Sequence, residues 1–164
     1  MGALRRCAWI EIARPMCKKQ FVCCLYRAQD CPTDSLLEDV NNCVKRIPDE
    51  AELTILGDFN IDVAAKKGSS NFFLKRKLFN FADLHSLEQL IKSPTRITES
   101  SETTIDLILV NNNHRIVDSG VVQCTISDHS LVYCTLKAGV SRAVPRIIEH
   151  RSYKNYDKVV LFTT

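Results

Sequence analysis

A short apolar strand that ends in a polar turn constrains this chain more than any other stretch. Residues 53–56 are apolar or β-prone, and Gly57-Asp58-Phe59-Asn60 follow directly. The apolar run predicts a buried strand, and the glycine predicts its end. Because sites in α/β folds usually form beyond the carboxyl ends of strands, Asp58 and Asn60 become candidate site residues. The alternative is a structural turn that Asx hydrogen bonds stabilise.

The segments before this strand predict an α/β unit. Residues 8–13 alternate as in a half-buried strand, and residues 21–26 form a second strand-like run. Residues 35–47 place apolar side chains at helical spacing, with Asp34 or Ser35 as the expected cap and Pro48 as the stop. A strand, a helix and the strand at 53–56 in this order predict a βαβ-like unit.

The rest of the chain adds a helix and three strands. An amphipathic helix is expected over residues 71–82, and we expect its aromatic side chains to pack in the core. Residues 103–110 are the most β-prone run, and residues 117–125 and 131–136 predict two more strands. The predicted class is therefore α/β, with mixed sheets flanked by helices.

Length and composition indicate one intracellular domain. A chain of 164 residues with 45% apolar and 25% charged residues is typical of a soluble globular domain. No apolar run approaches the roughly 18 residues of a membrane span, and no signal peptide is recognisable. The eight cysteines contain no CxxC pair, which disfavours a zinc site, and we expect reduced thiols. Nuclear and cytoplasmic locations are not distinguished.

The charge lies mainly in the tail. The net charge is +3, and basic residues outnumber acidic ones only after residue 136. This pattern predicts a solvated basic tail and disfavours a strongly basic nucleic-acid-binding surface over the remaining chain.

Asp106 is the second candidate site residue. It is expected in the middle of an apolar strand, where an unpaired carboxylate would be costly, so we expect a partner. His129, at the start of another strand, is the natural partner, because an aspartate that binds one imidazole nitrogen orients the other toward a substrate. A satisfied structural carboxylate is the alternative for Asp106, and a polar turn is the alternative for the segment around His129.

Together these groups suit metal-assisted phosphodiester hydrolysis. Asp58 and Asp128 offer carboxylates to a hard divalent cation, and Asn60 offers an amide to a phosphate or an attacking water. The Asp106–His129 pair would stabilise developing charge on the phosphate oxygens.

Four ordered motifs carry a family resemblance. They are Gly57-Asp58-Phe59-Asn60, Ser93-Pro94-Thr95-Arg96-Ile97-Thr98, Thr104-Ile105-Asp106-Leu107-Ile108 and Ser127-Asp128-His129. The chain from about Trp9 to Leu136 resembles the endonuclease/exonuclease/phosphatase superfamily. More narrowly, it resembles the apurinic-endonuclease-like domain of non-LTR (LINE-type) retrotransposon polyproteins.

The resemblance implies a fold, a cofactor and roles for the motif residues. The fold would be a four-layer α/β sandwich, and the cofactor would be Mg²⁺ or Mn²⁺. Asp58 would orient or activate the attacking water, and Asn60 would hold that water or the phosphate. Asp106 would orient His129 toward the scissile phosphate, and Asp128 would lie at the metal.

The resemblance also implies substrate contacts and a partner. Tyr26 would approach the phosphate, and Arg96 would bind substrate. The partner would be the phosphate backbone of DNA, with no membrane and no evidence for a protein partner. Residues 138–164 would be a basic connector to a reverse transcriptase domain in a parent polyprotein.

The chain departs from the family at its start. Ala28 stands where retroelement relatives usually have proline, and the early strands that carry an Asn and a metal-binding Glu are not recognisable. Glu11 is a poor substitute, because it alternates as a surface residue. The expectation is an amino-terminally truncated, incomplete sandwich over residues 1–137, with an exposed sheet edge and impaired activity. The alternatives are a non-enzymatic remnant with weak nucleic-acid binding, or another phosphodiesterase or phosphatase of the superfamily.

Overall fold

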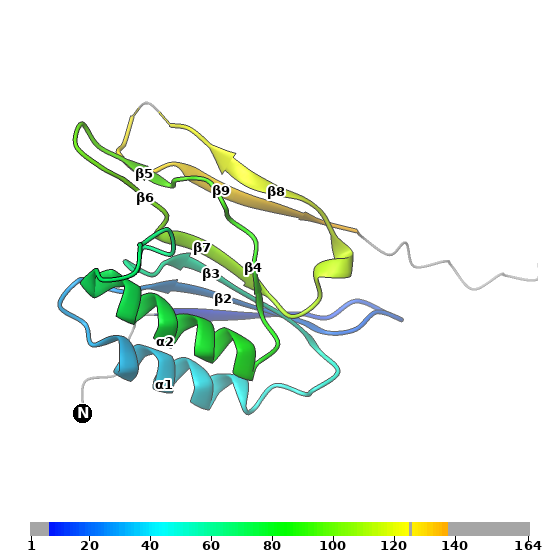
Figure 1. The fold of residues 1–164 in the computed structure, drawn as a ribbon. Helices are drawn as coiled ribbons and strands as arrows, with labels where there is room; N and C mark the ends of the chain where they lie inside the picture. The colour runs from blue at the N-terminus through cyan, green and yellow to red at the C-terminus, as the bar shows by residue number, and fades with distance from the viewer. Residues whose placement is uncertain (1–6, 125, 138–164) are drawn as a thin grey trace, which may run out of the picture.

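A five-stranded mixed sheet forms the centre of the protein (Figure 1). The computed structural model describes residues 7–124 and 126–137. The strands of the sheet, in spatial order, are β1 (Cys7–Ile12), β2 (Gln20–Tyr26), β3 (Glu52–Asp58), β7 (Asp106–Val110) and β4 (Glu88–Gln89). Only β2 and β3 run parallel, and the other neighbours are antiparallel.

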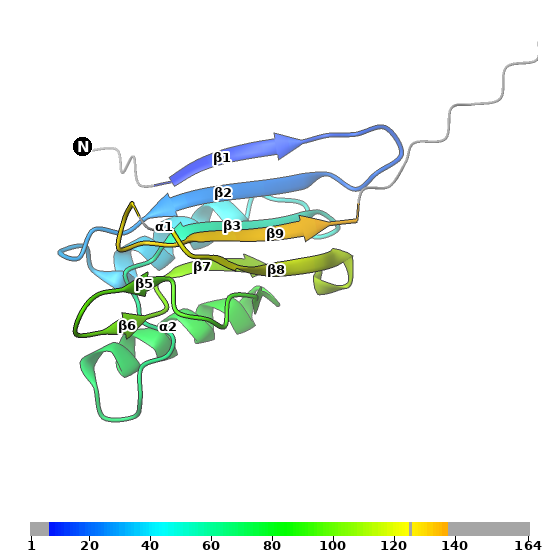
Figure 2. The ribbon, with the colours of Figure 1, turned by 90° about the horizontal axis from the view of Figure 1, so that it is seen from above.

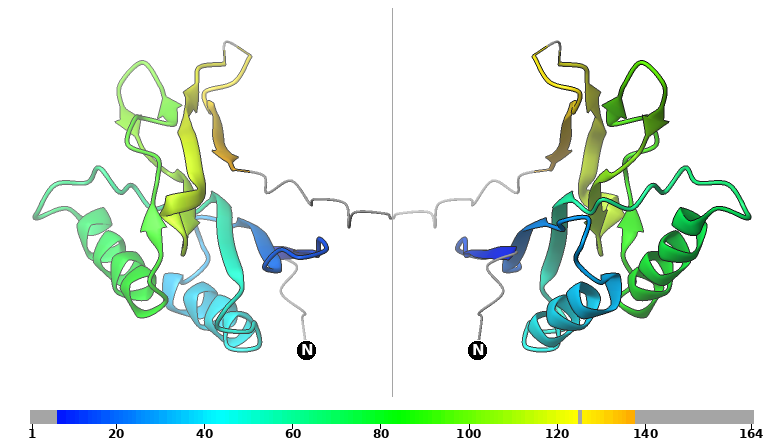
Figure 3. Two further views of the ribbon diagram at one scale, coloured as in Figure 1. Left: turned by 90° about the vertical axis from the view of Figure 1, so that its right-hand side faces the viewer. Right: turned by 90° about the vertical axis from the view of Figure 1, so that its left-hand side faces the viewer.

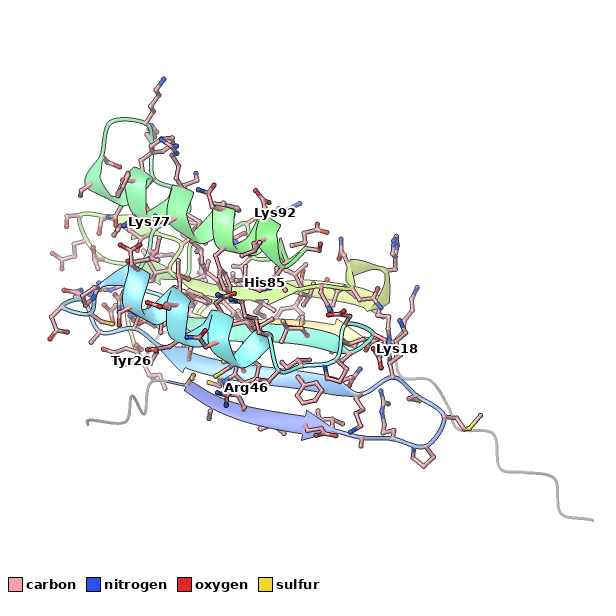
Figure 4. All side chains as sticks on the ribbon, turned by 90° about the horizontal axis from the view of Figure 1, so that it is seen from below. Lys18, Tyr26, Arg46, Lys77, His85 and Lys92 are labelled. Carbon is pink, nitrogen blue, oxygen red and sulfur yellow. The ribbon has the colours of Figure 1, made fainter. Side chains whose placement is uncertain are left out.

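Two helices cover one face of this sheet. The parallel pair β2–β3 is joined through α1 (Thr33–Val44), which confirms the predicted βαβ unit. Helix α2 (Ser70–Leu84) lies beside α1 on the same face (Figure 4). The main core forms between helices and sheet from apolar side chains of both layers, among them Cys23, Leu25, Leu36, Val40, Leu53, Ile55, Leu78, Phe81, Leu107 and Leu109.

The opposite face of the sheet carries a β-hairpin. Strands β8 (Ile116–Val122) and β9 (Leu131–Leu136) pair antiparallel and lie over β3 and β7 (Figures 1 and 2). A second apolar cluster joins the two layers, with Ile108 and Val110 of β7 packed against Val121 and Val132 of the hairpin. The side view in Figure 3 shows the helices and the hairpin on opposite faces of the sheet.

Two short strands, β5 (Arg96–Ile97) and β6 (Glu102–Thr103), form a separate antiparallel pair next to one end of β7. The predicted strand over residues 103–110 is therefore wrong in its extent. It is interrupted after Thr103, because the backbone of Thr104 and Ile105 bonds the loop after β3. Asp106 is consequently the first residue of β7 and does not lie in mid-strand.

Helix boundaries also differ from the prediction. The residue before α1 is Pro32, with no side-chain cap, so neither Asp34 nor Ser35 caps this helix. Helix α2 is capped by Ser69, whose Oγ accepts from the Phe72 amide at 3.2 Å. The aromatic residues of α2 are only partly core: Phe81 is buried, whereas Phe73 is 58% exposed and lies beneath the Lys77 ammonium.

Part of the sheet is open to solvent. Strand β1 is an edge strand, and its outward side chains Ile10 and Ile12 are exposed on the face that lacks helices. Neither helix in the described part of the chain has the length and apolarity that a membrane crossing requires. The predicted connector at 138–164 and the end of the strand predicted at 117–125, Thr125, lie outside the described residues.

Candidate active site at the β3–β7 edge

Two aspartates meet where β3 ends and β7 begins. Asp58 is the last residue of β3, Asp106 is the first of β7, and the antiparallel register pairs them directly. Burial raises the pKa of the Asp58 carboxyl above its usual range, and the negative charge of Asp106 raises it further. The arrangement places two carboxylates side by side at one end of the sheet.

His129 joins this pair from another part of the chain. Its Nδ1 lies 3.1 Å from Oδ2 and 3.3 Å from Oδ1 of Asp106. The segment that carries it is held against β5, since the Ser130 amide donates to the Thr95 carbonyl at 2.7 Å and the Ile97 amide donates to the Asp128 carbonyl at 3.0 Å. With Nδ1 engaged by Asp106, Nε2 remains for a substrate or an ion.

Asp58, Asp106 and His129 form a donor set that could hold a metal ion. One ligand atom from each of the three residues lies within 4.8 Å of the others. Two carboxylates and an imidazole suit a divalent cation, and a cation between the carboxylates would relieve their mutual repulsion. The sequence had suggested Asp58 and Asp128 as the carboxylates near a metal, whereas this group contains Asp106.

Asn60 closes the turn beyond Asp58. Its backbone is left-handed, with φ of 48°, a conformation that asparagine tolerates better than most residues. Its amide N–H donates to Asp58 Oδ1 at 2.8 Å, and its Nδ2 donates to the Arg27 carbonyl at 2.7 Å and to Asp58 Oδ2 at 3.2 Å. The turn therefore contains the Asx hydrogen bonds expected of a purely structural turn. It also places Asn60 beside Asp58 at the end of β3.

Gly57 allows β3 to pass close to β2 just before this turn. It has φ of 138°, and a Cβ atom there would lie 1.9 Å from the Leu25 carbonyl oxygen. Glycine is therefore required by both backbone conformation and space.

Arg27 is a site component that the sequence reasoning missed. It is 4% exposed and wraps the Asp58–Asn60 turn. Its backbone N–H donates to the Asp58 carbonyl at 2.9 Å, its Nε to the Phe59 carbonyl at 2.6 Å, and its Nη2 to the Asn60 carbonyl at 2.6 Å. The one available signal is the position of this arginine immediately after the apolar run at residues 21–26.

Thr95 is a second component that was missed as an individual residue. Its side chain is fully buried, and its Oγ1 accepts from the backbone amides of Ile105 and Asp106 at 3.1 and 3.0 Å. Thr95 thus fixes the start of β7 and with it the position of Asp106. The Ser-Pro-Thr-Arg stretch had been noted only as a family motif.

Arg96 and Asp128 lie beside the three-residue group and bind each other. Arg96 Nε donates to Asp128 Oδ2 at 2.7 Å, and this hydrogen bond lowers the pKa of the exposed Asp128 carboxyl. Asp128 is not one of the three residues that converge, so its predicted place at a metal stays a prediction. Tyr26 pairs with Asp58 in the β2–β3 ladder and is 57% exposed, while Glu11 forms an ion pair with Lys19 at the other end of β1.

Two hollows are relevant to the choice of site. One of about 300 Å³ lies against the Asp58–Asn60 turn and is lined by Arg27, Gln29, Asn60, Asn71 and Arg96 among others. A larger one, of about 480 Å³, lies between α2 and the β4 segment, away from the carboxylates. Of the candidate site residues, Asn60 and Arg96 line the smaller hollow, whereas Asp58, Asp106 and His129 do not.

Comparison with known proteins shows the family and the fold of the chain. Residues 20–133 match the model of a family described as Endonuclease-reverse transcriptase. No curated protein sequence matches the chain.

Among solved structures, the chain is similar to the endonuclease domain of TRAS1, a telomere-specific non-LTR retrotransposon. That match has 17% identity and a TM-score of 0.67, and it covers 81% of this chain and 64% of the domain. An endonuclease/exonuclease/phosphatase family protein from Leptotrichia buccalis has 14% identity and a TM-score of 0.59, with 80% of this chain and 54% of that protein covered.

A beta toxin variant from Staphylococcus aureus with bound magnesium ions has 16% identity and a TM-score of 0.50, with 80% of this chain and 58% of the toxin covered. At these identities the structural matches show the fold, and the chain spans only 54–64% of the length of the three proteins.

Proposed function

Because this chain belongs to the Endonuclease-reverse transcriptase family and has the endonuclease/exonuclease/phosphatase fold, we propose that it hydrolyses DNA phosphodiester bonds with a divalent metal ion. The observation that carries the proposal is the convergence of Asp58, Asp106 and His129 where β3 ends and β7 begins. The three residues come from segments far apart in the sequence. A purely structural explanation gives no reason for two carboxylates to be placed side by side there, at a cost in repulsion.

The metal ion would be Mg²⁺ or Mn²⁺, held by Asp58 and Asp106. Carboxylate oxygens are the preferred ligands of both ions. When bound, the ion would neutralise charge on the phosphate oxygens. Burial is the main cause of the raised pKa of Asp58, and the charge of Asp106 adds to it. A cation would offset the second of these effects.

His129 would contact the scissile phosphate through Nε2. Asp106 holds Nδ1, which fixes the ring orientation and stabilises the imidazolium form. A positive imidazolium beside the phosphate favours the extra negative charge of the transition state.

Asn60 and Asp58 would position the attacking water. Both hydrogens of the Asn60 carboxamide are directed to the Arg27 carbonyl and Asp58, so its Oδ1 is the atom left to accept from water. Asp58 would accept the proton that the water loses.

Arg96 and Tyr26 would bind the DNA backbone on either side. Arg96 shares its guanidinium with Asp128, and its side chain remains 36% exposed and open to a phosphate oxygen. Asp128 would lie at the metal ion, beside Asp58 and Asp106. We further propose that residues 1–137 are part of a larger endonuclease domain and that residues 138–164 connect it to a reverse transcriptase.

Nicking of supercoiled plasmid tests this function. The wild-type chain should convert supercoiled to open-circular DNA with Mg²⁺ or Mn²⁺, and a chelator should stop the reaction. Asn60→Ala and His129→Ala should reduce the rate by about 100-fold or more, which is the usual effect of losing a general acid–base or electrostatic group.

His85→Ala is the matched control for His129. His85 lies between the two helices, where its Nε2 is 2.9 Å from Asn41 Oδ1, far from the β3–β7 edge (Figure 4). Equal nicking by wild type, Asn60→Ala and His129→Ala would reject the assigned residues. Salt-sensitive DNA binding without metal-dependent nicking would instead favour a binding remnant, and cleavage of RNA or phosphomonoesters in place of DNA would change the substrate class.

A further inference from the structure

We propose that Arg27 is a positioning residue, whose guanidinium holds the Asp58–Asn60 turn in the conformation that directs Asn60 toward the reacting water. The inference rests on the proposed function for its catalytic consequence, and on the hydrogen-bond geometry for its structural part.

Arg27 binds three consecutive carbonyl oxygens of the turn. Its backbone N–H donates to the Asp58 carbonyl at 2.9 Å. Its Nε donates to the Phe59 carbonyl at 2.6 Å, and its Nη2 donates to the Asn60 carbonyl at 2.6 Å. Nη1 donates to the Cys31 carbonyl at 2.6 Å, which ties the turn to the start of α1. In return, Asn60 Nδ2 donates to the Arg27 carbonyl at 2.7 Å. The two residues therefore fix each other.

The burial of the charge is unusual for a residue without a carboxylate partner. Arg27 is 4% exposed, and within residues 7–124 and 126–137 it forms no ion pair. A buried charge is costly unless hydrogen bonds compensate it. These guanidinium hydrogen bonds all end on carbonyl groups, and the charge of Asp58 adds an electrostatic attraction. The planar fork of arginine provides this hydrogen-bond geometry, and a lysine ammonium cannot reproduce it.

The conformation that Arg27 stabilises is one that asparagine adopts only at a cost. Asn60 has φ of 48°, in the left-handed region. The bond from Arg27 Nη2 to the Asn60 carbonyl and the bond from Asn60 Nδ2 to the Arg27 carbonyl are both formed in that conformation. Without the guanidinium, the Phe59 and Asn60 carbonyls would lose their donors, and only the bonds of Asn60 to Asp58 and to the Arg27 main chain would hold the turn. We expect the turn to relax and Asn60 to become less firmly directed.

Arg27 is placed to act without touching the reacting atoms. Its guanidinium hydrogen bonds all end on main-chain carbonyls of residues 31, 59 and 60. We therefore expect its loss to reduce kcat and to leave KM unchanged, because the effect passes through the position of Asn60. A displacement of about 1 Å in a catalytic group can cost about 100-fold in rate.

The test compares Arg27→Lys, Arg27→Ala and Arg27→Met with Arg115→Met. Arg115 is the matched control, because it forms a partly buried ion pair with Glu52 at the opposite end of β3. All variants are assayed at a temperature at which circular dichroism shows them folded. We expect Arg27→Lys and Arg27→Met to lower the kcat of nicking by about 100-fold with KM unchanged, and Arg115→Met to keep the wild-type kcat.

Added guanidinium gives a second readout. Millimolar guanidinium, with sodium chloride as the ionic control, should restore part of the rate to Arg27→Ala, in which the space is vacated. It should not restore the rate to Arg27→Met, because the methionine side chain fills that space. Absence of rescue together with equal losses of rate in Arg27→Lys and Arg115→Met would show a merely structural role and overturn the proposal.

The third readout does not depend on activity. The side-chain amide signals of Asn60, assigned by their loss in Asn60→Ala, should be protected from hydrogen exchange in wild type. They should exchange at least about tenfold faster in Arg27→Met than in Arg115→Met. If wild type fails to nick DNA but this difference is observed, the positioning role stands and the proposed function falls. If the Asn60 signals are unchanged in Arg27→Met, the positioning role is wrong.

Discussion

Asp58 and Asp106 are direct partners in the antiparallel ladder between β3 and β7, at the point where one strand ends and the other begins. This pairing places like charges next to each other, and His129 contacts the Asp106 carboxylate, with its Nδ1 3.1 Å from Oδ2. The pair costs stability through its repulsion and gains a place where a cation and a phosphate would meet.

Asp106→Asn should remove activity without destabilising the fold. The neutral amide accepts through one oxygen only and carries no charge, so it orients the imidazole less firmly and does not stabilise the imidazolium, and kcat should decrease by about 100- to 10,000-fold. The unfolding midpoint should stay level or increase, because the repulsion with Asp58 is removed. Single-turnover nicking and thermal melting measure the two effects.

Asp118→Asn is the control for that substitution. Asp118 accepts from the Tyr133 hydroxyl at 2.9 Å on the exposed hairpin, so the same chemical change should leave nicking intact. Wild-type nicking by Asp106→Asn would contradict its assignment as the residue that orients His129.

Thr95→Val should destabilise the protein and displace Asp106. Valine keeps the shape and removes the oxygen that accepts from the Ile105 and Asp106 amides, so two buried donors lose their partner. The expected loss is about 2–4 kcal/mol of unfolding free energy, measured by urea denaturation. Thr95→Ser keeps the hydroxyl and should lose only about 1 kcal/mol. Equal losses in the two variants would refute the role of the oxygen.

Gly57→Ala should be among the most destabilising single changes in the chain. The new Cβ would lie 1.9 Å from the Leu25 carbonyl oxygen at a backbone φ of 138°, so β2 and β3 must separate. We expect a loss of more than about 4 kcal/mol.

Gly68→Ala is the control, because its φ is 100° and nothing lies within 4 Å of a Cβ there. This variant introduces backbone strain without a steric clash, so it should lower the free energy of unfolding by about 1–2 kcal/mol. Thermal melts of both variants would show whether the steric contact, rather than strain, decides the outcome at Gly57.

Glu52 should make stability fall in acid. Burial alone would raise the pKa of Glu52, but hydrogen bonds from Arg115 and Gln20 outweigh it and lower the pKa below the usual 4.5. The ionised form is therefore favoured by folding. Its contribution is fully present above pH 4.5 and is lost as the pH falls through the lowered value.

Arg115→Met should remove this dependence. Loss of the guanidinium leaves a half-satisfied buried carboxylate, at a cost of about 2 kcal/mol near neutral pH. The unfolding free energy of the variant should then vary less than that of wild type between pH 3 and pH 5. Parallel pH profiles for the two proteins would contradict the assignment.

Arg96→Met should weaken substrate binding and leave stability unchanged. The Arg96–Asp128 ion pair is half exposed, so little of the fold depends on it. Loss of one charge-assisted phosphate contact should raise KM for DNA by about tenfold and reduce its salt dependence. A change in kcat with a constant KM would place Arg96 in the chemical step instead.

The sequence alone determined the fold class, the βαβ unit and the place of Asp58 and Asn60 at a strand end, although β3 runs through Gly57 and includes Asp58. These features depend on local patterns: apolar periodicity, a glycine, and polar residues at a strand end. The order of four short motifs also determined the family. Such information lies within a few residues and needs no knowledge of distant contacts.

Only the tertiary structure decided how the site is held together. Asp106 begins β7 because Thr95, 11 residues away, binds its amide, and Arg27 fixes Asn60 across 33 residues. Asp106, and not Asp128, joins Asp58 because the β3–β7 register pairs the two aspartates. His129 was expected from the sequence as the partner of Asp106, but the other hydrogen bonds and the register depend on how distant segments pack, which no local pattern encodes.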